Sequence, residues 1–65
     1  MAEHTVRLYR DVAGQFRWQR RARNGRVISD SGEGYTTKGA ALDGLYLANR
    51  DSDHYQFTDD TEEQP

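Results

Sequence analysis

Three short segments of the chain contain residue types that take part in catalysis. Ser52-Asp53-His54 combines the residue types of a hydrolase triad, but adjacent residues cannot converge on one reacting atom as a triad requires. Gly32-Glu33-Gly34 is a G-x-G without the rest of a nucleotide fingerprint, and its glutamate would repel a phosphate at a helix N-terminus. The paired carboxylates at 59–60 and 62–63 lie on a tail, where no pocket raises a pKa. We therefore predict a non-enzymatic protein without catalytic residues.

Residues that bind metals are equally sparse. The chain has no cysteine, and His4 and His54 lie 50 residues apart, outside any metal-ligand spacing. The sequence thus predicts no metal, no cofactor and no disulfide. The longest apolar run, Leu45-Tyr46-Leu47-Ala48, is far shorter than the roughly 20 residues of a membrane span and the ~7 of a signal-peptide core. We expect a cytoplasmic protein with no membrane partner.

Basic residues concentrate in the first part of the sequence. Residues 1–26 hold seven arginines against Glu3 and Asp11, a local charge of +5, whereas residues 27–65 hold Lys38 and Arg50 against nine acids, a local charge of −7. Such asymmetry is found in polyanion-binding domains with an acidic tail. The alternative is that the two halves neutralise each other within one fold or one dimer.

Alternation of apolar and polar residues predicts two strands that carry this charge. Residues 5–10 place Val6 and Leu8 on one face, and residues 16–23 place Phe16, Trp18 and Ala22 on one face. The opposite face is the candidate site for a polyanion or nucleic acid, because arginine contacts phosphate and aromatic rings stack on bases. An antiparallel sheet also commonly leaves one polar face in water, and the acidic tail could cover this face. The candidate polyanion-binding residues are Arg7, Tyr9, Arg17, Gln19, Arg21 and Arg23.

Asn24-Gly25 predicts a hairpin into a third strand at residues 26–30. A two-residue turn would pair Ala22 with Val27 and turn Val27 to the core. A three-residue turn with Gly25 as the left-handed bulge would pair Ala22 with Arg26 and turn Ile28 to the core, beside Trp18. We favour the bulged turn, because it buries the bulkier side chain and keeps two arginines from facing each other directly.

A helix is expected over residues 38–50, with Thr37 as its N-cap. Its apolar stripe comprises Ala41, Leu45 and Ala48, widened by Leu42 and Tyr46. A glycine inside a helix costs about 1 kcal/mol relative to alanine, so Gly44 indicates a close approach of the helix to the sheet or to a partner. Residues 54–58 alternate and predict a fourth strand, with Tyr55 and Phe57 on one face. We expect one domain at 1–58 and a disordered acidic tail at 59–65.

The predicted elements contain a set of short sequence segments in a fixed order. They are Phe16-Arg17-Trp18, Ala22-Arg23-Asn24-Gly25, Ile28, Ser31, Gly34-Tyr35-Thr36-Thr37-Lys38 and Gly44-Leu45. In this pattern the chain resembles the YegP-like family, a domain of unknown function, from about Val6 to Asn49. The resemblance implies an α+β fold: a β-β-β-α-β unit, an antiparallel sheet with one helix on one face. It also implies a homodimer whose two units form a continuous sheet and exchange C-terminal strands. The chain departs from the pattern at Arg20, which replaces a core leucine, and at Ala48.

The size of the chain gives an independent reason to expect a dimer. It has 65 residues and only 15 sizeable apolar side chains, and a domain this small buries about 60% of the surface that its unfolded chain exposes. Either it folds marginally alone or it completes its core against a second copy. We predict an obligate homodimer in which the fourth strand pairs with the other subunit, since the link at 51–53 leaves little chain for folding back. Deleting residues 52–65 should then abolish the fold, and deleting 60–65 should do little.

Overall fold

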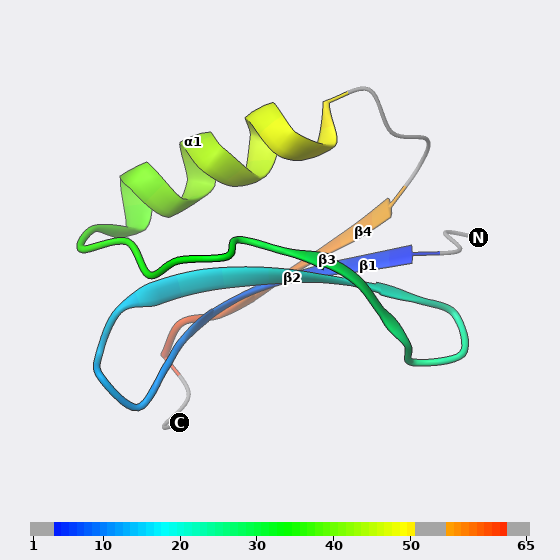
Figure 1. The fold of residues 1–65 in the computed structure, drawn as a ribbon, viewed down its shortest axis with the longest axis horizontal. Coiled ribbons are helices and arrows are strands. Elements are labelled where there is room, and N and C mark those ends of the chain that lie inside the picture. Colours follow the sequence, from blue (N-terminus) through cyan, green and yellow to red (C-terminus); the bar gives the residue numbers. More distant parts are fainter. Residues whose placement is uncertain (1–3, 51–54, 63–65) are drawn as a thin grey trace.

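The computed structural model describes residues 4–50 and 55–62 (Figure 1). The elements follow in the expected order, with one helix lying across one face of a four-stranded sheet. They are β1 (His4–Arg10), β2 (Phe16–Ala22), β3 (Val27–Asp30), α1 (Lys38–Asn49) and β4 (Tyr55–Asp60). The predicted β-β-β-α-β order is confirmed, and the fold is α+β.

The sheet is mixed, and the expectation of an antiparallel sheet is wrong in one respect. Its strand order is β3-β2-β1-β4; β1 pairs antiparallel with β2, and β2 with β3, but β4 runs parallel to β1. Because β3 is antiparallel to β2 and β2 is antiparallel to β1, β3 runs parallel to β1. The connection through α1 then carries the chain back to the end of the sheet at which β3 began. A helical crossover of this kind joins parallel strands, so β4 enters the sheet parallel to β1.

The β2–β3 hairpin has the three-residue bulged turn. The Ala22 amide donates to the Arg26 carbonyl (2.8 Å) and the Gly25 amide donates to the Ala22 carbonyl (2.9 Å). Gly25 has a φ of +87°, as the left-handed bulge position requires. Arg21 then pairs with Val27, as this turn requires, but Arg20 pairs with Ser29 and not with Ile28.

Ile28 is therefore an unpaired residue in a second irregularity of this hairpin, and the expectation that it faces the core is wrong. Its side chain is 48% exposed, and that of Val27 is 42% exposed. One inserted residue shifts the register of every residue that follows it. Each alternative for the turn placed one residue of β3 in the core, because neither included this second shift.

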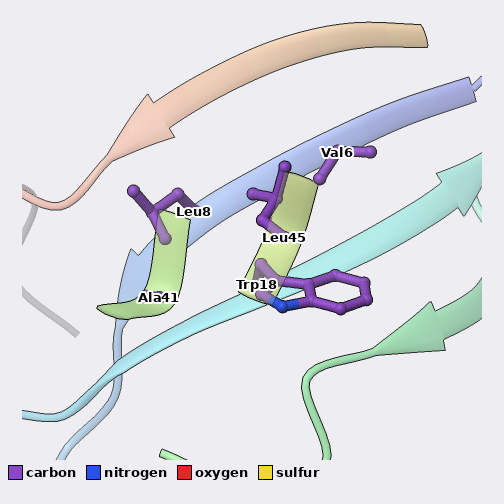
Figure 2. Close-up of a cluster of buried hydrophobic side chains, with 5 residues drawn as sticks. All are labelled: Val6, Leu8, Trp18, Ala41 and Leu45. Atoms are coloured by element: carbon purple, nitrogen blue, oxygen red, sulfur yellow. The ribbon is translucent and has the colours of Figure 1, made fainter. Parts of the chain in front are cut away.

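The hydrophobic core lies between α1 and the two central strands (Figure 2). Its five buried side chains come from β1, β2 and α1; they are Val6, Leu8, Trp18, Ala41 and Leu45. Leu45 lies between Val6 and Trp18 in Figure 2, so the helix rests directly on β1 and β2. Trp18 is expected to be buried beneath the helix near Leu45 and Ile28. It is 4% exposed and belongs to the same buried cluster as Leu45, whereas Ile28 does not belong to that cluster.

The helix begins and packs largely as expected. The Thr37 hydroxyl accepts from the Ala40 amide (3.1 Å), which confirms the N-cap. The buried stripe, however, is Ala41, Leu45 and Asn49, whereas Ala48 is exposed and Tyr46 is 54% exposed. A spacing of i, i+4, i+8 fits one helix face as well as i, i+4, i+7 does, and Asn49 is the residue with a polar partner in the sheet.

β4 extends further than the sequence indicated. It includes Asp59 and Asp60, and Thr61 beyond it is only 6% exposed, so these residues belong to the fold and not to an acidic tail. Tyr55 packs against the core, but Phe57 is 40% exposed. In this single chain the strand lies beside β1. Residues 51–54 and 63–65, including the predicted start of this strand at His54, lie outside the described residues.

Candidate functional site

The face of the sheet opposite the helix carries most of the predicted polyanion-binding residues. Arg7 lies opposite Gln19, and Tyr9 lies opposite Arg17. Arg21 follows on the same face of β2, because successive side chains of a strand alternate between faces. The sixth predicted residue, Arg23, comes after the end of β2, in the turn. The structure thus brings five of the six together on one surface, which we call the open face.

Two arginines of the open face are already paired with carboxylates. Arg7 Nε lies 2.5 Å from Asp60 Oδ2, and Arg17 Nε lies 2.5 Å from Asp11 Oδ2. The hydrogen bond from Arg17 lowers the pKa of the Asp11 carboxyl below its usual value. Arg7 also lies over the Tyr9 ring, with its Cζ 4.8 Å from the ring centroid, an arrangement typical of cation–π attraction.

Asp60 reaches the open face through the register of β4. It lies opposite Tyr9 on the neighbouring strand β1. A phosphate approaching Arg7 or Arg17 must therefore compete with a carboxylate already in contact with the guanidinium. Binding of a polyanion by the open face stays a prediction, and the charge on this face is partly neutralised within the chain.

Arg21 is held differently from Arg7 and Arg17. Its Nε donates to Gln19 Oε1 (3.2 Å) and its Nη1 donates to the Gly25 carbonyl (2.8 Å). Both acceptors are neutral. Among the described residues Arg21 has no carboxylate partner, so its charge is positioned without being neutralised.

A polar cluster is buried around Arg20 on the helix side of the sheet. The resemblance implied a core position for Arg20, but the sequence did not indicate its partners. Arg20 is only 6% exposed; its Nε donates to His4 Nδ1 (2.9 Å) and its Nη1 donates to Asn49 Oδ1 (3.0 Å). Asn49 in turn donates to the Leu45 carbonyl (2.7 Å), and Arg20 Cζ lies 5.2 Å from the centroid of the Tyr55 ring. Four elements thus meet at one guanidinium. The sequence signal for this cluster was Asn49, which lies on the buried stripe of the helix. The sequence analysis instead placed Ala48, the preceding residue, on that stripe.

The segments considered for catalysis and metal binding form no common site in the part of the chain that the structure describes. Glu33 is exposed in a loop, where its carbonyl accepts from the Ser31 hydroxyl (2.8 Å). Within residues 4–50 and 55–62, no group of three or more histidine, cysteine, aspartate or glutamate side chains is placed to hold a metal ion. The segment Ser52-Asp53-His54 lies outside the described residues. No helix in the described part is long and apolar enough to cross a membrane.

Several residues of the sequence pattern have structural roles. The Tyr35 backbone pairs with Phe16 through two hydrogen bonds of 2.8 Å. Its ring covers Gly44, where an added Cβ would lie 2.5 Å from Tyr35 Oη. Gly44 is thus a point of close approach, but its neighbour is the Tyr35 ring from the connection before the helix and not a strand of the sheet. Gly25 and Thr37 shape a turn and a helix start, so these residues of the pattern specify a fold and not a reaction.

Comparison with known proteins gives the same assignment. The family model described as "Domain of unknown function (DUF1508)" matches residues 11–54. A protein from Haloferax volcanii, solved by NMR in solution, is 33% identical with a TM-score of 0.70, covering 83% of this chain and 95% of its own. Among proteins with curated descriptions, none matches. The chain belongs to the DUF1508 family, the YegP-like domain of unknown function.

Proposed function

We propose that this chain acts as a non-enzymatic homodimeric module that exchanges β4 between its two subunits. The observation that carries the proposal is the position of β4 as an outer strand with an exposed aromatic side chain. β4 pairs on one side with β1 and has no strand on the other among the described residues, and Phe57 is 40% exposed. A single chain thus leaves both backbone groups and apolar surface uncovered at this edge.

The contacts of β4 are of a kind that a second copy could supply equally well. Besides its ladder with β1, the C-terminal segment is held by three basic side chains. Arg7 pairs with Asp60, Lys38 Nζ lies 2.6 Å from Asp59 Oδ2, and Arg10 Nε donates to the Thr61 carbonyl (2.8 Å). An identical strand from a partner presents the same groups in the same register. Exchange therefore preserves each contact, which is the usual basis of domain swapping in symmetric dimers.

The thin core supports the same proposal. Only five apolar side chains are buried among the described residues, and small domains with little core gain from association. Tyr46 and Leu47 on α1 are 54% and 65% exposed, so apolar surface remains on the helix as well. The cytoplasm, expected from the sequence, stays the predicted compartment.

Light scattering and thermal unfolding at several protein concentrations test for the dimer. We expect twice the chain mass of 7.5 kDa and a melting temperature that rises with concentration, because dissociation accompanies unfolding. A folded monomer at micromolar concentration, with a melting temperature independent of concentration, would contradict the proposal.

Complementary charge reversals distinguish exchange from simple association. Arg7→Glu alone places two acids together, and Asp60→Arg alone places two arginines together. In an exchanged heterodimer of the two variants, each reversed residue meets its complement in the other chain, so both pairs are restored. We expect the 1:1 mixture to form heterodimers more stable than either variant alone. A mixture no more stable than its components would show that each β4 stays with its own chain.

A further inference from the structure

Seven basic side chains fall into two groups according to their partners. Arg7, Arg17 and Lys38 each contact a carboxylate at 2.5–2.6 Å. In contrast, the stretch from Gln19 to Ser29 contains four arginines and no acid. Within the described residues none of these four forms an ion pair, and they gather around the β2–β3 turn. They are Arg20, Arg21, Arg23 and Arg26.

A hollow of about 280 Å³ lies at this end of the hairpin, lined by His4, Ala22, Arg23 and Asn24. Asn24 Oδ1 accepts from the Arg26 amide (3.0 Å), which leaves the side-chain NH₂ as the hydrogen-bonding group available to a ligand. His4 Nδ1 accepts from Arg20 Nε, so the neutral imidazole carries its proton on Nε2. The polar groups of the hollow are therefore donors.

The surroundings add positive charge to these donors. The buried Arg20 guanidinium contacts His4 at the wall of the hollow, and Arg21 is fixed over the turn by the Gly25 carbonyl. Arg23 and Arg26 are exposed, and their side chains form no hydrogen bond within the described part of the chain. Hydrogen-bond donors beside arginines that form no ion pair within the described residues have the chemistry that binds an oxyanion.

We propose that the end of the β2–β3 hairpin binds a phosphate group, seated in the hollow by Arg23, Asn24 and His4. Arg21 and Arg26 extend the site along the turn, so that a ligand with successive phosphates meets more than one guanidinium. This differs from the open-face hypothesis, because Arg7 and Arg17 are excluded by their carboxylate partners. The phosphate could come from a free or small phosphorylated molecule or from a single-stranded nucleic acid backbone, which present the same group.

Amide-resolved NMR titration of the full chain tests the site. One sample receives inorganic phosphate, a second receives a single-stranded oligonucleotide, and a third receives sodium chloride at matched ionic strength. We expect saturable shifts at residues 22–26 that chloride does not reproduce. A response to both phosphate and oligonucleotide assigns the hollow to single phosphate groups, and a response to the oligonucleotide alone assigns it to a nucleic acid backbone. No saturable response in either sample, or shifts centred on Arg7 and Arg17, would overturn the proposal.

A matched pair of variants tests which arginines bind. Arg23→Gln with Arg26→Gln removes two exposed charges that form no hydrogen bond or ion pair in the described part of the chain, so the fold should persist. We expect about tenfold weaker binding of the responding ligand, and for the oligonucleotide a salt slope smaller by about 1.4, since each phosphate contact to a single strand contributes about 0.7. Arg17→Gln removes one charge from the open face and should change affinity less than about twofold. Equal losses in both would refute the assignment to the hairpin end.

Discussion

Gly44 shows how a single residue allows the helix to approach the Tyr35 ring. Alanine is favoured over glycine in a helix by about 1 kcal/mol, yet a Cβ at Gly44 would lie 2.5 Å from Tyr35 Oη and 3.1 Å from Cζ. Gly39 provides the contrast, because nothing lies within 4 Å of its Cβ position. The two glycines of α1 are thus equivalent in helix propensity and opposite in packing.

We expect Gly44→Ala to destabilise the protein by about 1–3 kcal/mol, the usual cost of overpacking. Gly39→Ala should be neutral or stabilising by up to about 1 kcal/mol. In a Tyr35→Ala background the penalty at Gly44 should disappear, because the ring that the Cβ meets is gone. Urea unfolding of the four variants measures these free energies. Equal effects of the two Gly→Ala changes would show that the Tyr35 contact does not matter.

Trp18 combines full burial with an unsatisfied donor. It is 4% exposed, and its Nε1 has no hydrogen-bond partner among the described residues. Trp18→Ala should cost about 3–5 kcal/mol through the cavity it leaves, whereas Trp18→Phe should cost clearly less, because it keeps an aromatic ring and removes the unpaired N–H. Chemical denaturation followed by circular dichroism compares the two variants. A Phe variant as unstable as the Ala variant would mean that the indole N–H is bonded after all.

At the scale of elements, the hairpin turn depends on Gly25. Its φ of +87° is strained for a side chain with a Cβ, and no neighbour lies within 4 Å of that Cβ position. Gly25→Val should therefore cost about 1 kcal/mol or more from the backbone alone. Gly25→Asn should cost less, since asparagine tolerates the left-handed region. Thermal unfolding distinguishes the two, and equal melting temperatures would show that φ at this residue is not limiting.

The ion pair between α1 and β4 should make stability depend on pH. The hydrogen bond from Lys38, with those from Thr61, lowers the pKa of Asp59 from 3.8 to about 2. The folded state therefore binds its proton less readily than the unfolded state does. The stabilisation is complete above about pH 5 and is lost as the pH falls toward 2.

Asp59→Asn should flatten this acid dependence. Asp43→Asn, on the exposed side of α1, should leave it unchanged, since Asp43 forms no ion pair within the described residues. The difference between the variants should shrink in high salt, because the pair is partly exposed and screened. Urea unfolding across this pH range provides the measurement. Identical pH profiles for the wild type and Asp59→Asn would contradict the role of the pair.

Sequence patterns predicted the helix and strands better than they predicted strand register, strand direction and side-chain partners. Alternation in β1 and β2 and the Thr37 cap depend on local chemistry, so strand faces and the helix start were readable. The exposure of Ile28 and the direction of β4 depend on a register shift and on a crossover, which local patterns do not encode. The open face was located correctly, but its pairing with Asp11 and Asp60 was not. Asp60 in particular is distant in sequence and meets Arg7 only through the register of β4.

At the scale of the whole molecule, the basic and acidic parts of the sequence lie together in the fold, so part of their charge is neutralised. The acidic C-terminal segment lies against the basic N-terminal strand: Asp60 pairs with Arg7, and the Thr61 carbonyl accepts from Arg10. The hypothesis that the two halves neutralise each other is supported at this end of the sheet. At the other end, the four arginines of the hairpin remain without acidic partners in the part of the chain that the structure describes.

This arrangement changes the expectation for C-terminal truncation. Deleting residues 60–65 was expected to do little, but it removes Asp60 from its pair with Arg7 and the buried Thr61. We now expect a chain ending at Asp59 to lose about 1–2 kcal/mol of stability, within the range for loss of buried and paired groups. In a domain of this size that lowers the melting temperature by roughly 4–8 °C per kcal/mol. A chain ending at Glu62 keeps both contacts and should melt like the full chain. Calorimetry of the two truncations decides the matter, since equal melting temperatures would show that Asp60 and Thr61 contribute nothing to the fold.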